Sequence, residues 1–102
     1  MDRAVRSWAE TEVPKHPEVV RLGYFGSYAR GDWSVGSDLD LIAVVTTSRE
    51  PFERRPLTWP LEELPVPAEL LVYTVEEWER LQKDRGRLAR VLEREAVWIV
   101  GY

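Results

Sequence analysis

Cysteine is absent from the 102-residue sequence, which excludes disulfides and thiolate metal sites and is compatible with a reducing compartment. No run of 18 apolar residues is present, and the charged N-terminal region has no apolar signal core, so we predict neither a membrane span nor a signal peptide. The basic excess typical of a broad nucleic-acid surface is also missing, because the formal net charge is −4. We therefore expect a cytoplasmic protein that does not contact nucleic acid directly.

Histidine is scarce, with His16 as the single example. Because Pro14 and Pro17 flank it, we expect His16 to be a solvated loop residue rather than a ligand. The length predicts one domain, residues 1–102, with little chain left over for a separate substrate-binding domain. A partner would then have to supply much of the shape of the substrate.

A Gly-Ser pair follows the first apolar run of the chain. Residues 18–25 are rich in β-branched and aromatic side chains and predict a β-strand that stops at Gly26. If a helix begins there, Ser27 occupies the N-cap position, and the first backbone N–H groups point outward with the positive end of the helix dipole. Such a turn is suited to phosphate oxygens.

Two alternating aspartates open the second apolar run, residues 38–46. Side chains two apart in a strand project to the same face, so we expect Asp38 and Asp40 to stand side by side. Two close carboxylates raise each other's pKa unless a cation lies between them, and Mg²⁺ suits carboxylates combined with substrate phosphates. A phosphate site facing a Mg²⁺ site is the arrangement needed for nucleotidyl transfer, in which two metals about 4 Å apart hold the attacking and leaving oxygens.

Gly26-Ser27, ten intervening residues and Asp38-x-Asp40 resemble the signature of the polymerase-β-type nucleotidyltransferase superfamily. The segments Gly-Ser-Tyr-Ala-Arg-Gly and Ser-Asp-Leu-Asp-Leu are close to the form found in its minimal nucleotidyltransferases, which are small stand-alone domains. The resemblance implies that the Gly-Ser turn holds nucleotide phosphates and that the Asp-x-Asp pair holds Mg²⁺. It also implies a third carboxylate on a later strand.

That third carboxylate, usually Asp in the family, corresponds here to Glu69 at the start of the apolar run 69–74. The extra methylene moves the carboxylate outward by roughly 1 Å, which departs from the usual geometry. A solvated glutamate at a strand end is the alternative interpretation.

The remaining patterns complete an α/β (α+β) fold. We predict a small mixed β-sheet covered by helices, with the active site at one edge beside the Gly-Ser turn. The apolar last strand is suited to pair with another chain at a sheet edge. The sequence therefore allows an oligomer. The expected order is helix 1–13, strand 18–25, helical turn 27–31, strand 38–46, a proline-rich connection 47–67, strand 69–74, helix 75–83, helix 88–94 and strand 96–102.

The sequence allows two interpretations for several side chains. Arg30 either contacts nucleotide phosphate or braces the site by pairing with a motif carboxylate. Trp33 either stacks on a nucleobase or packs within the protein. The aromatic and arginine residues of the connection 47–67 offer contacts to a partner, and the alternative is that Phe52 and Trp59 cover the sheet. The arginines near the last helix form either a solvated or a binding face. These residues are Phe52, Arg54, Arg55, Trp59, Arg85, Arg87, Arg90 and Arg94.

We expect transfer of AMP from ATP to an acceptor hydroxyl, with Mg²⁺, two ions in all, as cofactor. Adenine itself is not selected by any residue pattern. The catalytic and metal-binding residues are expected to be Asp38, Asp40 and Glu69, and the nucleotide-binding residues Gly26, Ser27, Arg30 and Ser37.

The resemblance also implies a partner. Similar proteins are commonly encoded beside a small helical HEPN-domain protein, and the pair forms a toxin–antitoxin system in which the nucleotidyltransferase binds the HEPN RNase, adenylylates a tyrosine on it, or both. One alternative is a non-catalytic binding antitoxin with a vestigial metal site. Another is a small-molecule nucleotidyltransferase of the aminoglycoside type.

Overall fold

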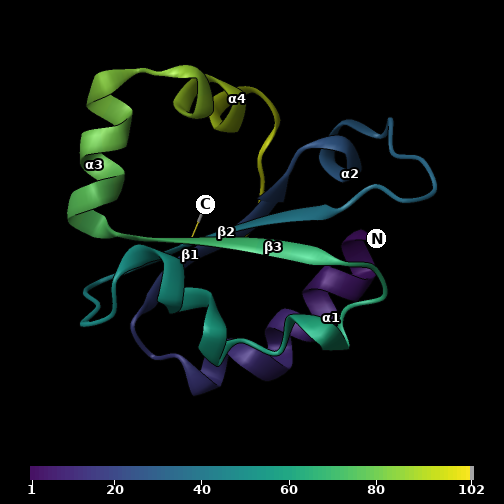
Figure 1. Cartoon of the computed structure of the whole chain (residues 1–102), viewed down its shortest axis with the longest axis horizontal. Helices are drawn as coiled ribbons and strands as arrows, with labels where there is room; N and C mark the ends of the chain where they lie inside the picture. Colours follow the sequence, from purple (N-terminus) through teal and green to yellow (C-terminus); the bar gives the residue numbers. More distant parts are fainter. Residues whose placement is uncertain (102) are drawn as a thin grey trace.

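Four strands form one mixed β-sheet in the computed structural model, which describes residues 1–101 (Figure 1). The strand order is β3-β2-β1-β4, with β1 antiparallel to β2 and β4, and β2 parallel to β3. The predicted mixed sheet with covering helices is confirmed. The elements are α1 (Asp2–Glu12), η1 (Val13–Lys15), β1 (Val19–Phe25), α2 (Ser27–Arg30), β2 (Leu39–Val45), η2 (Phe52–Thr58), η3 (Leu61–Glu63), β3 (Ala68–Thr74), α3 (Val75–Asp84), α4 (Arg87–Glu95) and β4 (Val97–Val100).

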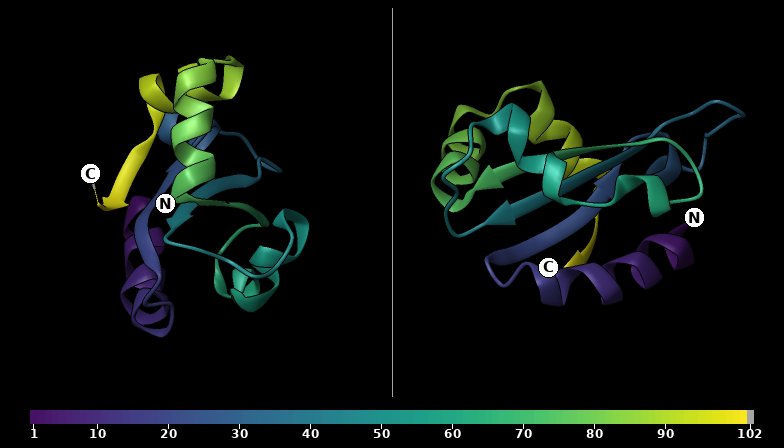
Figure 2. Two further views of the ribbon diagram at one scale, coloured as in Figure 1. Left: turned by 90° about the vertical axis from the view of Figure 1, so that its left-hand side faces the viewer. Right: turned by 60° about the horizontal axis from the view of Figure 1, so that its bottom comes forward.

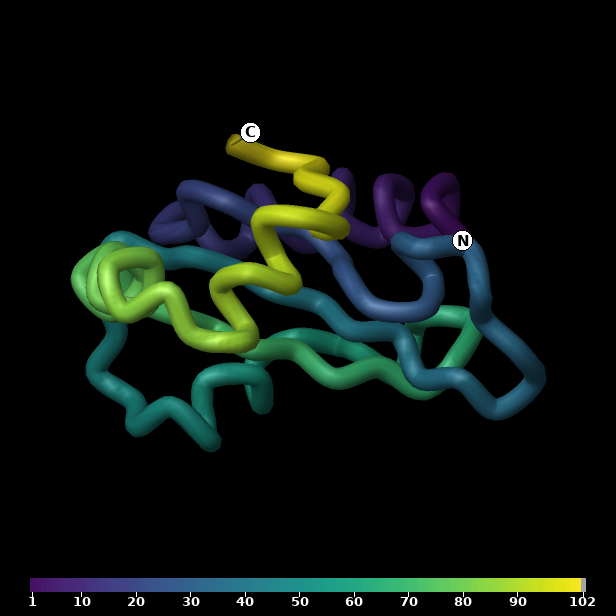
Figure 3. Tube along the Cα trace, turned by 90° about the horizontal axis from the view of Figure 1, so that it is seen from above, coloured from purple at the N-terminus to yellow at the C-terminus, as the bar shows by residue number. Residues whose placement is uncertain are grey.

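The sheet has two differently covered faces. Helix α1 and the connection between β2 and β3 cover one face, whereas α3 and α4 lie on the other (Figures 1 and 3). Alternate residues of each strand point to opposite faces, so one set of apolar side chains forms the core with α1. The fully buried members of that core are Val5, Leu22, Leu39, Leu41 and Ala43.

His16 is not the solvated loop residue that the flanking prolines predict. Its residue is 9% exposed, and its ring stacks on the indole of Trp59 with centroids 3.8 Å apart and planes 4° from parallel. The buried carboxylate of Glu12 lies 3.5 Å from His16 Nε2. The prediction failed because the connection between β2 and β3 folds back over the end of α1. The residues next to His16 in the sequence do not specify this long-range contact.

The connection covers the sheet rather than extending into solvent. Trp59 is 6% exposed and contacts Trp8, whose indole N–H donates to the carbonyl of Pro60 at 3.1 Å. Arg55 donates to the carbonyl of Val72 at 3.0 Å and forms an ion pair with Glu77 at 2.6 Å. That guanidinium lowers the pKa of Glu77 below its ordinary value. The covering interpretation therefore holds for Trp59, and the Arg55 guanidinium binds β3 and α3 rather than being presented to a partner.

Helix α3 begins at Val75, as the sequence predicts, and Thr74 is its N-cap. The Thr74 hydroxyl accepts from the backbone N–H of Glu77 at 3.2 Å, and the Glu77 carboxylate accepts from the N–H of Thr74 at 2.9 Å, which completes a capping box. No helix among residues 1–101 is long and apolar enough to span a bilayer.

Strand β4 forms one edge of the sheet and pairs with β1, as Figure 2 shows. It is shorter than the predicted strand 96–102, and Tyr102 lies outside the described residues.

Candidate functional site

The two halves of the sequence motif lie against each other. Gly26 joins β1 to α2 with φ 80° and ψ −154°, a conformation that is essentially restricted to glycine. A Cβ atom built on Gly26 would overlap Asp40 Oδ2. The close approach of this turn to the carboxylate therefore depends on the missing side chain.

Ser27 is not the N-cap residue that we predict from the sequence. Gly26 is the N-cap, Ser27 is the first residue of α2, and no side chain caps the helix. Because α2 has only four residues, a phosphate at this turn would depend on individual donors more than on a helix dipole.

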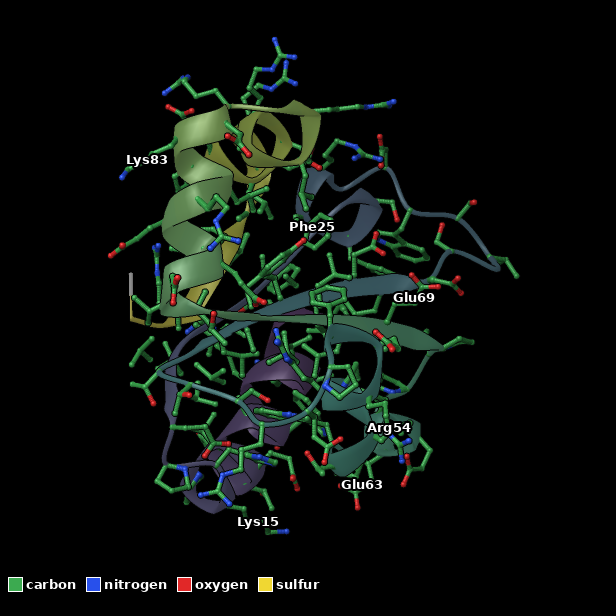
Figure 4. All side chains as sticks on the ribbon, turned by 60° about the vertical axis from the view of Figure 1, so that its left-hand side comes forward. Lys15, Phe25, Arg54, Glu63, Glu69 and Lys83 are labelled. Carbon is green, nitrogen blue, oxygen red and sulfur yellow. The ribbon has the colours of Figure 1, made fainter. Side chains whose placement is uncertain are left out.

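The acidic side of the site is formed by β2 and the strand beside it. Asp40 pairs with Phe25 of β1 on one side and with Glu69 of β3 on the other, and paired residues of neighbouring strands point to the same face. Asp38 immediately precedes β2, and Figure 4 labels Glu69 near the start of β3. Burial, followed by the charges of Glu69 and Asp38, raises the pKa of Asp40 above its ordinary value. A cation at this position would relieve both effects.

Asp38 and Asp40 offer the oxygen ligands that Mg²⁺ prefers, and a substrate phosphate would complete the shell of such an ion. Within residues 1–101, however, no three His, Cys, Asp or Glu side chains gather as a metal-binding group. Glu69 thus shares the face of Asp40 without forming a three-carboxylate cluster with the pair.

An open cleft of about 800 Å³ contains both halves of the motif. It brings together all the residues that the sequence assigns to the nucleotide and the Asp-x-Asp pair, but Glu69 is not part of its wall. Four residues of α4 complete it. The sequence left a binding face open for the two arginines among them, but it did not place this helix at the motif. The wall consists of Phe25, Gly26, Ser27, Arg30, Ser37, Asp38, Asp40, Arg87, Val91, Arg94 and Glu95.

Helix α4 is amphipathic, with Ala89 and Leu92 buried beneath it. Arg87 and Arg94 lie seven residues apart, two helical turns, and both face the cleft. Neither forms an ion pair with any residue of the described part of the chain. Their spacing was visible in the sequence, but only the packing of α4 beside β1 shows that they meet the motif.

The profile of the family described as "Nucleotidyltransferase domain" matches residues 6–100. The chain belongs to this family. A candidate nucleotidyltransferase from Sulfolobus solfataricus, with a crystal structure at 1.40 Å resolution, is similar in fold, with a TM-score of 0.62 and 20% sequence identity over 94% of this chain and 76% of that one. No curated protein sequence matches the chain significantly.

In this nucleotidyltransferase domain, Arg30 braces the site through carboxylates outside the motif. Its Nε donates to Asp32 at 3.0 Å, and its Nη1 donates to the two oxygens of Glu95 at 3.1 and 3.3 Å. Glu95 Oε1 also accepts from the backbone N–H of Gly26 at 3.2 Å. The expected pairing with a motif carboxylate is therefore replaced by pairing with Asp32 and Glu95.

Trp33 lies in the loop that projects beyond α2 (Figure 1). It is 56% exposed and stacks on Tyr28, with ring centroids 5.6 Å apart. It does not belong to the wall of the cleft.

Proposed function

We propose that this nucleotidyltransferase domain transfers AMP from ATP to an acceptor hydroxyl in a Mg²⁺-dependent reaction. The acceptor oxygen bonds to the α-phosphorus, the bond from the α-phosphorus to the bridging oxygen breaks, and pyrophosphate leaves. The observation that supports this most directly is the packing of the Gly26 turn against Asp40 in one cleft. It brings a backbone turn suited to phosphate against a carboxylate suited to a metal.

The residues of the cleft divide into two roles. Asp38 and Asp40 would hold Mg²⁺, which when bound neutralises charge on the phosphates and on the leaving group. Gly26, Ser27, Arg30 and Ser37 would bind the nucleotide. Arg30 is paired with Glu95 in this structure, whereas the guanidinium groups of Arg87 and Arg94 form no ion pair within residues 1–101 and would be available to the terminal phosphates.

The position of the transferred phosphate gives the first test. With ATP and Mg²⁺, and with acceptor that co-purifies with the protein, label should pass to the acceptor from α-labelled ATP and stay off it with γ-labelled ATP. Nucleotidyl transfer retains the α-phosphate, whereas phosphoryl transfer moves the γ-phosphate. Gel autoradiography of the two reactions separates these outcomes, and γ-label on the acceptor would contradict the proposal.

Glu69 gives a second test, because it shares a face with Asp40 but lies outside the wall of the cleft. We propose that its carboxylate takes the proton of the acceptor hydroxyl, and that it joins Asp38 and Asp40 at one metal site only once Mg²⁺ and nucleotide are bound. Glu69→Gln should then slow transfer about 100-fold, the scale of a lost general base, whereas Glu69→Asp should preserve or raise the rate.

The measurement is single-turnover transfer at saturating Mg²⁺ for the parent, Glu69→Asp and Glu69→Gln, with nucleotide affinity measured beside it. Affinity should change much less than rate, because the other nucleotide contacts remain. Equal rates for all three proteins would show that Glu69 is a solvated strand-end residue.

We further propose that the acceptor is a tyrosine on a HEPN-type toxin partner, so that the protein acts as the antitoxin of a pair. Support comes from the motif resemblance and from the cleft, which is open to an acceptor supplied by another molecule. Mass spectrometry of the labelled acceptor tests this, because a modified tyrosine is expected. Label on a small molecule instead would favour the aminoglycoside-type alternative, and ATP binding without any transfer would favour the non-catalytic antitoxin.

A further inference from the structure

The phosphate site of this protein already holds an anion, the carboxylate of Glu95. We propose that Glu95 competes with the terminal phosphates of the nucleotide for the donors of the Gly26 turn, and that its side chain must leave before a triphosphate binds there. This inference rests on the proposed nucleotide site. It assigns to Glu95 the effect of lowering the affinity of that site for triphosphates.

Competition is supported by two hydrogen-bond donors that converge on one oxygen atom of Glu95. The N–H of Gly26 and the Nη1 of Arg30 both donate to Glu95 Oε1, at 3.2 and 3.1 Å. Two donors aimed at a single anionic oxygen would serve a phosphate oxygen equally well. A carboxylate and a phosphate cannot occupy the same position, so binding at these donors requires exchange.

The charge and the burial of Glu95 both oppose the binding of a nucleotide at this position. The Glu95 side chain is only 16% exposed, and its charge contributes to the raised pKa of Asp40. A nucleotide that met this carboxylate would encounter additional negative charge beside the phosphates. Repulsion from a largely buried carboxylate is screened less than repulsion from a fully exposed one.

The exchange needs only a side-chain movement. Glu95 is the last residue of α4, and the helix is held in place through buried Ala89 and Leu92, which face away from the cleft. Rotation about the side-chain bonds can release the carboxylate while Arg87 and Arg94 stay beside the cleft. These two arginines, which have no ion pair in the described part of the chain, would then face the arriving phosphates.

The size of the effect follows from the fraction of molecules with a free site. Apparent affinity equals the intrinsic affinity multiplied by that fraction, so a site free in about a tenth of the molecules binds triphosphate about 10-fold more weakly. Glu95→Gln keeps the size of the side chain but removes its charge. Glu95→Asp keeps the charge near the cleft but withdraws the carboxylate from Gly26 by about one bond length.

The test measures the affinities of Mg·ATP and of AMP with Mg²⁺ by calorimetry for the parent and both variants. Glu95→Gln and Glu95→Asp should each bind ATP about 10-fold more tightly, with AMP affinity unchanged because AMP lacks the terminal phosphates. Glu93→Gln is the matched control, since Glu93 lies on the same helix, pairs only with Arg85 and lies outside the wall of the cleft. It should behave as the parent.

Each other outcome overturns the inference. A gain in Glu95→Gln alone would mean general repulsion rather than occupancy of the donors, and weaker binding of both ATP and AMP would mean that Glu95 is an anchor of the turn. Equal ATP affinity in all proteins would reject competition while leaving the proposed function in place. Absence of Mg·ATP binding in the parent and in every variant would reject both.

Discussion

Asp38→Asn combined with Asp40→Asn should abolish Mg²⁺-dependent binding of ATP and lower the transfer rate by about 10³-fold or more. The two carboxylates are the proposed metal ligands, and a catalytic metal contributes several kcal/mol to stabilisation of the transition state. Folding should be unaffected or slightly favoured without Mg²⁺, because burial and neighbouring charges already disfavour ionised Asp40. The measurements are calorimetric binding, single-turnover transfer and thermal unfolding.

Asp84→Asn is the matched control for that double variant. Asp84 is an exposed residue at the end of α3 and takes no part in the cleft, so its substitution should leave binding and transfer unchanged. If the double variant bound Mg·ATP as tightly as the parent does, the metal site would have to lie elsewhere on the molecule.

Gly26→Ala should both destabilise the protein and disable the site. The free energy of unfolding should fall by about 2–4 kcal/mol, because alanine is strained at φ 80° and ψ −154° and its Cβ would displace Asp40. Displacement of Asp40 should also lower transfer by the folded protein. Chemical denaturation and transfer measured below the unfolding transition separate these two effects.

Gly31→Ala distinguishes the collision with Asp40 from backbone strain alone. Gly31 also has a positive φ, 86°, but no heavy atom lies within 4 Å of a Cβ built there. Its substitution should cost only about 1–2 kcal/mol and leave transfer intact. Equal losses of activity at the two glycines would contradict the role given to the contact between Gly26 and Asp40.

Local patterns in the sequence were sufficient for most of the elements and for the centre of the candidate site. The apolar runs around Gly26 and Asp38 predicted two strands, and the alternation of strand residues predicted that Asp38 and Asp40 stand side by side. These predictions depend on backbone preferences and side-chain periodicity over a few residues, which the sequence carries directly.

The surroundings of that centre required the tertiary structure. Predictions that failed, such as solvated His16 and Ser27 as the N-cap, depend on contacts or backbone geometry that their neighbours in sequence do not specify. The sequence predicted Arg55 as a possible partner contact, and only the folded connection shows its ion pair with Glu77.

The sequence by itself determined a mixed sheet carrying a Gly-Ser turn and two aspartates at the ends of adjacent strands. Only the tertiary structure decided that α4 forms the remaining wall of the cleft and that Glu95 contacts Gly26 from 69 residues away. It also decided that Arg87 and Arg94 face the cleft without an ion pair to any described residue. The physical reason is that strand periodicity is a local property, whereas the position of α4 follows from packing its buried face beside β1, a contact between distant parts of the chain.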